Sequence, residues 1–374
     1  MRKECIYCGV TFTKENNSDE HLIPEGIGGK LSRKYLLCKE CNNKTLGKFD
    51  KAIQEHISLF LNIKRIKGKR GKEVSVKGDS KLGKIIFKDG IPIVLPSVID
   101  NADGSKIILG DKKYTEDILN GFKKKYPNLK VKERKDETLS MISLKLIDQK
   151  VWKGIGKILY LYAHFFDEDY TPKTVFFKDF LSQSEEIVPF ICPLGWASRK
   201  IENLLDFPEE FKKSRNDCHL VILDYRSEEN CIIGYVNFFG IGYIGIIDDN
   251  YEGDSKVLGY YVNVKSKDDK ELSSLNKLNI TRKDLIKLTD DWLTDESLIL
   301  FKDQYSQAFQ EAKLSKDIED AFFSTAGKTG LKEGEILDEK WLEAFMEEFM
   351  ASDTMKNLLK QSEKQHNEKE DQYK

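Results

Sequence analysis

The chain has 374 residues, of which 40% are hydrophobic and 33% are charged, and its formal net charge is −2. At roughly 100–200 residues per domain, this length predicts two or three domains with hydrophobic cores, which excludes a fully disordered protein. No run approaches the roughly 18 consecutive apolar residues of a membrane helix, and no apolar signal segment precedes the first motif. We therefore expect a cytoplasmic protein without a membrane partner.

Charge is distributed unevenly along the chain. Residues 1–90 contain 20 Lys and Arg against 11 Asp and Glu, whereas the remaining residues contain 41 against 52. A basic first part followed by an acidic remainder indicates that a polyanion such as nucleic acid would contact the first part.

Four of the seven cysteines lie close to the start, in two widely separated C-x-x-C pairs: Cys5 with Cys8, and Cys38 with Cys41. Four thiolates in two such pairs suit tetrahedral Zn²⁺. A redox function is the alternative for C-x-x-C, but no βαβ pattern surrounds these pairs, and two pairs need explaining. The sequence therefore predicts a structural zinc site with room for a second motif between the pairs.

That second motif runs from Glu20-His21 through Pro24 to Gly28-Gly29, and Asn42 follows the second cysteine pair directly. A Glu-His dipeptide alone is usually an exposed surface pair. As a set, however, these residues and the four cysteines resemble the zinc-knuckle branch of the HNH endonucleases, which have a ββα-metal (His-Me finger) core. The resemblance is confined to positions 1–60, which we take as the first domain.

The resemblance implies a role for each motif residue. His21, on the first strand of a hairpin, would be the general base that takes a proton from water, as a neutral imidazole can near pH 7. Glu20 and Asn42 would bind the catalytic divalent ion, Mg²⁺ or Mn²⁺, which prefers such oxygen ligands. The structural zinc would be a separate ion that clamps the hairpin to the following helix.

The sequence departs from the family pattern in several ways. Glu20 stands where many members have Asp, and Arg33–Tyr35 occupies a stretch where many carry an Asn that orients the base. The orienting group is left open between a backbone carbonyl and Asn43. A third contact to the catalytic metal is left open between Asp19 and Asp50.

Residues 61–72 form a basic, glycine-punctuated stretch that we interpret as an exposed linker after a helix over Asn42–Leu61. Lys and Arg contacts to phosphates would give binding that depends on salt and not on sequence. The alternative is an ordinary solvated lysine-rich surface. The residues predicted to contact nucleic acid are Lys30, Arg33, Lys34, Lys44, Lys48, Lys64, Arg65, Lys67, Lys69 and Arg70.

Residues 73–270 predict an α+β domain, interpreted as a sensor or regulatory domain. Helices are expected over Thr115–Lys125 and Gln149–Phe166, and turns at Asp89-Gly90 and Asp103-Gly104. Four short-looped strands late in this region predict an antiparallel meander, with a tight turn in Phe238–Tyr243. The expected strands are Val74–Val76, Lys84–Phe87, Ile91–Val94, Met141–Leu146, His219–Tyr225, Cys231–Phe238, Ile241–Ile247 and Val257–Val264.

Residues 271–360 predict a helical region, with helices at 281–289, 300–325 and 338–350. Thr281 followed by Asp284 is typical of a helix start. Trp341, Phe345 and Phe349 form a stripe that favours helix packing, with an oligomer or partner contact as the alternative. The polar tail over residues 361–374 predicts disorder.

The fold class is therefore α+β: an N-terminal ββα-metal finger with a four-cysteine zinc site, a β-rich middle domain and a helical C-terminal region. The resemblance implies an endonuclease that hydrolyses DNA, with RNA as an alternative substrate. We interpret its role as prokaryotic defence or restriction, with the C-terminal domains controlling activity through a ligand or partner, and a homodimer making double-strand breaks. Two other hypotheses are a zinc-braced nucleic-acid-binding module without cleavage, and an interaction protein that acts through its helical C-terminus.

Overall fold

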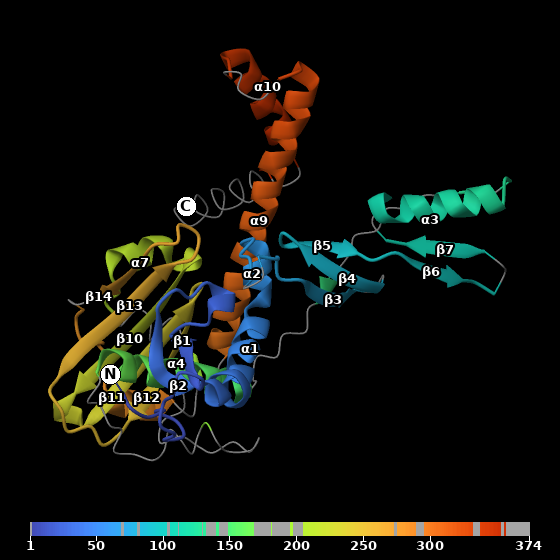
Figure 1. Cartoon of the computed structure of the whole chain (residues 1–374). Helices are drawn as coiled ribbons and strands as arrows, with labels where there is room; N and C mark the ends of the chain where they lie inside the picture. Colours follow the sequence, from blue (N-terminus) through green and yellow to red (C-terminus); the bar gives the residue numbers. More distant parts are fainter. Residues whose placement is uncertain are drawn as a thin grey trace.

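The computed structural model confirms an α+β fold with a finger at the N-terminus (Figure 1). It describes residues 2–68, 71–80, 83–102, 105–110, 112–128, 130–131, 140–141, 149–167, 181, 195–196, 205–272, 275–288, 295–331, 337–352 and 355–356. The turn expected at Asp103-Gly104, most of the strand expected over Met141–Leu146 and the tail over residues 361–374 lie outside these residues.

The finger is a hairpin followed by helical segments. Strand β1 (Asn17–His21) pairs antiparallel with β2 (Ser32–Cys38), and the short 3-10 helix η1 (Glu25–Ile27) lies in the connection. A π-helix, η2 (Cys41–Leu46), leads into α1 (Gly47–His56) and then α2 (Ser58–Ile63). The helix expected over Asn42–Leu61 is therefore three segments, with a break at Ile57.

The largest sheet has six strands in the order β14-β13-β10-β11-β12-β9, with antiparallel pairing between all neighbours. Its strands are β9 (Gly195–Trp196), β10 (Cys218–Arg226), β11 (Cys231–Phe238), β12 (Ile241–Asp248), β13 (Lys256–Asn263) and β14 (Asp269–Leu272). The four predicted strands are present, and β10 to β12 form a meander. The predicted meander is wrong for β13. This strand pairs with β10 and not with β12, which gives a Greek-key order.

The turn between β11 and β12 has the geometry that its sequence predicts. Phe239 and Gly240 both have positive φ, 51° and 87°. This backbone is that of the tight hairpin turns whose twist matches the flanking strands. Asp89 and Gly90, with φ of 52° and 77°, make the same kind of turn in the second sheet.

Helix α4 (Gln149–Phe166), with the bounds that the sequence predicts, lies between this sheet and the finger. It contacts β10, β11 and β12 on one side and α1 and β2 on the other. Gly154 allows the close approach of α1, because a Cβ there would lie 2.6 Å from Ile53 Cδ1 and 3.0 Å from the Phe49 carbonyl oxygen. Buried residues of the finger, α4 and the sheet belong to one continuous core.

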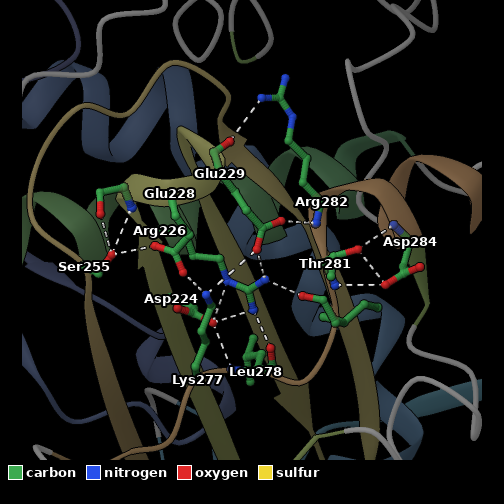
Figure 2. A network of polar contacts seen from close by, with 12 residues as sticks. Asp224, Arg226, Glu228, Glu229, Ser255, Lys277, Leu278, Thr281, Arg282 and Asp284 are labelled. Carbon is green, nitrogen blue, oxygen red and sulfur yellow. Dashed lines mark hydrogen bonds and ion pairs between the residues drawn. The ribbon is translucent and has the colours of Figure 1, made fainter.

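The opposite face of the sheet has its own core, covered by α7 (Glu209–Ser214), which precedes η3 (Arg215–Asp217), and by α8 (Arg282–Leu288) with the chain before it. A buried ion pair fixes that chain (Figure 2). Arg226 binds Asp224 Oδ2 through Nε and Nη2, at 3.0 and 2.7 Å, and donates to the carbonyls of Leu278 and Ile280. Glu229, in η4 (Ser227–Glu229), also accepts from Arg226.

The helix start predicted at Thr281 is confirmed. The Thr281 N–H donates to Asp284 Oδ2 at 3.1 Å, and the Asp284 N–H donates to Thr281 Oγ1 at 3.1 Å. This reciprocal pair satisfies backbone donors that a helix N-terminus leaves without partners. Figure 2 shows it beside the Arg226 network.

A second sheet has the order β5-β4-β3-β8, formed by β3 (Val76–Ser80), β4 (Gly83–Lys88), β5 (Ile91–Val94) and β8 (Ser140–Met141). The hairpin β6 (Ser97–Asp100) and β7 (Lys106–Leu109) joins α3 (Lys112–Lys125) in an arm that projects away from the large sheet (Figure 1). The predicted helix over Thr115–Lys125 is thus confirmed, and it begins earlier, at Lys112.

The helical C-terminal region is also confirmed. Helix α9 (Asp295–Thr329) contacts α2 and β5, and α10 (Glu339–Met350) packs against α9 at the end distant from the finger (Figure 1). Trp341 is buried, with its ring centroid 5.1 Å from that of Phe322 and 5.6 Å from that of Phe345. No helix of the described residues is long and apolar enough to cross a membrane.

His219 joins the sheet to the finger. Its ring is buried on β10, with Nε2 2.8 Å from the Ile27 carbonyl oxygen and ring centroids 5.1 and 4.5 Å from Phe238 and Phe239. Burial lowers the pKa of His219 to about 4, from an ordinary value of 6.5. The folded protein therefore keeps this ring neutral at pH values where the unfolded chain protonates it.

We expect His219 to make folding sensitive to acid. Between pH 6.5 and 4 the unfolded state binds the extra proton, so stability is complete above pH 6.5 and falls by about 3 kcal/mol as the pH decreases to 4. The measurement is the urea-unfolding free energy of the wild type and His219→Gln at several pH values. The difference between them should be constant above pH 6.5 and shrink below it; parallel curves throughout would contradict this assignment.

Candidate active site and zinc centre

The four cysteines of the two C-x-x-C pairs meet at one point. Their Sγ atoms all lie within 4.8 Å of one another, and Cys8 Sγ is 3.8 Å from Cys38 Sγ. A zinc ion with four bonds of about 2.3 Å separates its sulfur ligands by about 3.8 Å. Among the described residues, this is the one cluster of His, Cys, Asp or Glu ligand atoms suited to a metal ion.

Local backbone geometry builds this cluster. The Cys38 N–H donates to Cys5 Sγ at 3.4 Å, and the Cys41 N–H donates to Cys38 Sγ at 3.5 Å. Gly9, with φ of 74°, closes the first turn, and its N–H donates to the Cys5 carbonyl at 2.8 Å. The two N–H groups that reach sulfur stabilise negative charge there, as metal-bound thiolates need.

The buried Cys41 thiol resists ionisation unless a cation binds it. Burial, followed by the hydrogen bonds with Cys8 and Cys38, raises the pKa of the Cys41 thiol well above its ordinary value. A divalent cation reverses this, because it binds thiolates and lowers their pKa. The four cysteines would therefore hold Zn²⁺, and they join the first turn to the end of β2 and the start of η2.

His21 is the last residue of β1 and is half-buried, opposite Ser32 of β2. Strand alternation places it on the same face as Asp19 and opposite Glu20. The following residues, Leu22 and Ile23, are almost completely buried and anchor this end of the strand. In the part of the chain that the structure describes, no hydrogen bond joins the His21 ring to a carbonyl or to Asn43.

The two glycines of the motif permit close packing beside this strand end. Gly28 has φ of 99°, and a Cβ there would lie 2.4 Å from Val264 Cγ1 at the end of β13. A Cβ at Gly29 would lie 1.8 Å from the Ile23 carbonyl oxygen. The Gly-Gly pair therefore lets the connection fold back onto the strand end that carries His21 and against the large sheet.

Asn42 lies at the start of η2 and contacts the hairpin. Its Nδ2 donates to Ser18 Oγ at 3.2 Å and to the Asp19 carbonyl oxygen at 3.3 Å. Ser18 Oγ in turn donates to the Leu37 carbonyl of β2 at 2.7 Å. Asn42 thus links the helical segment to both strands, and its role as a metal ligand stays a prediction.

Glu20 is buried and bound to a residue far outside the motif that contains it. Its Oε1 lies 2.8 Å from Nζ of Lys157, on α4, and both side chains are almost completely buried, at 3% and 1% exposure. The same Nζ lies 2.8 and 2.7 Å from the two carboxylate oxygens of Asp50, on α1. One ammonium therefore sits between two carboxylates from the finger.

The three groups influence one another's charge. Burial, opposed by the charge of Lys157, raises the pKa of Glu20 to about 7. Burial also opposes the charge of Lys157, but Asp50 and Glu20 outweigh it and raise the pKa of the ammonium. Lys157 is therefore protonated, with Asp50 as its main counter-charge and Glu20 as the second.

As the residues lie, Glu20 and Asn42 do not form an open site for a divalent ion. Glu20 Oε1 contacts an ammonium, and Asn42 turns its amide nitrogen toward Ser18 and Asp19. Glu20 and Asp50 do converge on one point, but the cation there is Lys157. The sequence does not indicate this contact, because Lys150, Lys153 and Lys157 recur at helical spacing, a pattern typical of the solvent-exposed face of an amphipathic helix.

Some of the predicted nucleic-acid contacts have partners within the protein. Several side chains already bind the protein itself: Lys64 pairs with Asp217 (2.7 Å), Arg65 with Glu319 (2.8 Å), Lys30 with Asp269 (3.7 Å) and Lys44 with Glu40 (3.0 Å), while Arg33 donates to the Phe165 carbonyl. Lys34, Lys48 and Lys67 are exposed, and Lys30, Lys44 and Arg65 are also exposed although each has an ion-pair partner. Lys69 and Arg70 lie outside the described residues. Lys64 and Arg65 thus attach the end of α2 to the rest of the molecule.

Comparison with known proteins supports the resemblance of the first part of the chain. Residues 5–58 match the family model of the HNH endonucleases, which confirms the resemblance expected over positions 1–60. No curated protein and no solved structure matches the chain. The matched segment contains the four cysteines, the hairpin with His21, and α1 with Asp50, whereas Lys157 lies outside it.

Proposed function

We propose that this chain, whose residues 5–58 match the HNH endonucleases, is an endonuclease that hydrolyses phosphodiester bonds of DNA, with RNA as the alternative substrate. The observation that carries this proposal is the joint placement of the four-cysteine cluster and His21 within the matched hairpin and helix. Hydrolysis needs a base for the attacking water, and a neutral imidazole is suited to that task near pH 7.

The roles of the site residues follow from their positions. His21, at the half-buried end of β1, would take the proton from water. Asn42 and the zinc cluster would hold the hairpin and helix at a fixed separation. Asn42 joins η2 to β1, and the cysteine cluster joins η2 to β2. A requirement for Mg²⁺ or Mn²⁺, with Glu20 and Asn42 as ligands, stays a prediction.

The test is cleavage of supercoiled plasmid by the wild type with Mg²⁺ or Mn²⁺, with EDTA as control. Nicking that EDTA abolishes supports a metal-dependent endonuclease. Parallel reactions with single-stranded DNA and RNA identify the substrate. Absence of cleavage on all substrates by the folded, zinc-loaded protein contradicts the proposal.

A binding module without cleavage is the second candidate. The observation that favours it is the contact of Glu20 with Lys157, which engages one of the two residues predicted to bind the catalytic metal. This candidate needs the four cysteines but not His21, so it predicts nucleic-acid binding that does not change when His21 is replaced.

Control by the rest of the chain, in a defence or restriction role, is part of the same proposal. It is supported by the core that the finger shares with α4 and the large sheet, because movement of those elements would reach β1. Truncation is a poor test, since removing α4 would expose the finger's core. Substitutions at exposed surfaces of α9 or α10, followed by cleavage assays and measurement of the oligomeric state, test control and dimerisation without that damage.

Exposed lysines of the finger should contribute to DNA binding more than its paired cations. We expect Lys34→Ala/Lys48→Ala to weaken binding and to reduce the slope of log affinity against log salt by up to about 2. Fluorescence anisotropy at several salt concentrations measures both quantities. The matched control, Lys283→Ala/Lys340→Ala on α8 and α10, should change neither; equal effects of the two pairs would contradict a DNA surface on the finger.

A further inference from the structure

The Lys157 ammonium is a point at which the rest of the chain contacts β1, the strand that carries His21. It lies in α4, 107 residues after Asp50, and contacts Glu20 of β1 and Asp50 of α1 within 2.8 Å. It thus binds three elements together: β1, α1 and α4. Asp50 keeps 27% side-chain exposure, whereas the other two groups are almost fully buried.

The cluster is under strong electrostatic constraint. Removing one partner of a buried ion pair leaves an uncompensated charge, so each group holds the others in place. Glu20 can move away from Lys157 only by giving up its 2.8 Å contact with the ammonium, and both side chains are almost completely buried. Because α4 is itself fixed between α1 and the large sheet, its ammonium is a rigid reference point for β1.

The position of Glu20 makes this constraint relevant to catalysis. Glu20 directly precedes His21, so a fixed Glu20 side chain fixes the strand backbone from which the imidazole projects on the opposite face. Leu22 and Ile23 anchor the strand on the other side of His21. The imidazole is therefore held between an ionic anchor and an apolar anchor.

We propose that Lys157 is a positioning residue for His21, and that Glu20 serves mainly as the anchor of β1 to this ammonium rather than as a metal ligand. The inference rests on the proposed function in that His21 is taken as the general base. It assigns a role in the active site to a residue outside the HNH-like segment, and it explains why the finger shares its core with α4.

The experiment compares three variants of the full chain. Lys157→Met keeps much of the length of the side chain and removes its charge, whereas Lys157→Arg keeps the charge. Lys153→Met is the matched control, because Lys153 is also buried, lies one turn earlier on α4, and has Nζ 6.0 Å from the Phe49 ring centroid. Each variant is studied at a temperature where circular dichroism shows it folded.

Two readouts separate positioning from stability. The first is the NMR resonance of the His21 ring, assigned among the five histidines with His21→Gln, which does not depend on cleavage. The second is the division between kcat and KM. We expect Lys157→Met to shift the His21 resonance and to lower kcat about 10- to 100-fold, with KM within about threefold of the wild-type value. Lys157→Arg should keep a higher kcat than Lys157→Met. Lys153→Met should change neither the His21 resonance nor kcat.

The metal-binding part of the proposal is measured with Mn²⁺ alone, by electron paramagnetic resonance. Glu20→Gln should change the Mn²⁺ dissociation constant less than about threefold while shifting the His21 resonance as Lys157→Met does. A loss of Mn²⁺ affinity of about tenfold or more would overturn the proposal, because Glu20 would then be a ligand. Tighter Mn²⁺ binding and faster cleavage by Lys157→Met would also overturn it, since Lys157 would then be blocking a metal site.

The remaining outcomes are also decisive. An unchanged His21 resonance and kcat in folded Lys157→Met, with only a lower melting temperature, would reduce Lys157 to a structural tie. If Lys157→Met does not fold, Glu20→Gln supplies the same test of the anchor from the other partner. If the wild type cleaves no substrate, the proposed function fails, but the His21 resonance still decides whether Lys157 positions that ring.

Discussion

Replacing His21 with alanine should lower kcat for phosphodiester cleavage by about 10²- to 10⁴-fold, the contribution of a positioned general base. The imidazole is at the end of β1, and its ring makes no hydrogen bond within the described part of the chain, so its loss should not disturb the fold. Binding to DNA should change little, because phosphate contacts by Lys and Arg supply most of the affinity. Plasmid nicking rates and anisotropy titrations, made on the same preparations, measure the two effects.

The comparison has a built-in control for damage to the fold. His21→Gln keeps a polar side chain of similar reach but cannot act as a base near neutral pH, so it should lose cleavage as fully as His21→Ala. Neither variant should change the melting temperature by more than a few degrees or alter the zinc content. Wild-type cleavage by His21→Ala would remove His21 from the mechanism and leave the binding module as the better account.

Features that depend on neighbouring residues were predictable from the sequence. The C-x-x-C spacing predicted the cysteine cluster, and helical periodicity predicted both ends of α4. The Phe239-Gly240 turn followed from local backbone preference. In the helix and the turn, the interactions that decide the structure lie within a few residues of one another, and each cysteine pair is equally local.

Features that depend on distant partners were not predictable. The periodicity of β13 identifies a strand, but cannot tell that it pairs with β10 and not with β12. The stretch over positions 61–72 has the composition of a basic linker, because the carboxylates that bind Lys64 and Arg65 lie 153 and 254 residues away. These ion pairs direct the two cations toward the protein.

The same limit applies to the candidate site. The motif around His21 predicts a base and four zinc ligands, but Glu20 could be interpreted only through the family pattern. Its actual partner, Lys157, lies far later in the chain, on α4. The lysines of α4 recur at the spacing of a solvent-exposed helix face, so the sequence did not indicate that Lys157 is buried against two carboxylates.

Removing the zinc should have the largest effect on stability. Structural zinc sites of small fingers supply about 10–16 kcal/mol of apparent binding energy, which exceeds the stability of most domains. Cys38→Ser is the sharpest change, because Cys38 ends β2, lies 3.8 Å from Cys8 Sγ and accepts the Cys41 N–H through its sulfur. We expect this variant to lose zinc and to unfold cooperatively at much lower urea concentration.

The extent of that unfolding tests the architecture as well as the metal site. If the finger folded independently, loss of zinc would unfold residues 1–60 and leave the unfolding transition of the rest of the chain unchanged. Because its buried residues form one core with α4 and the large sheet, we expect both to be destabilised together, with one shifted transition. Cys231→Ser, at a buried cysteine in the other core, should keep full zinc content. Added zinc should restore the stability of the chelator-treated wild type but not that of Cys38→Ser. Two separate unfolding transitions would contradict this expectation and show that the finger folds alone.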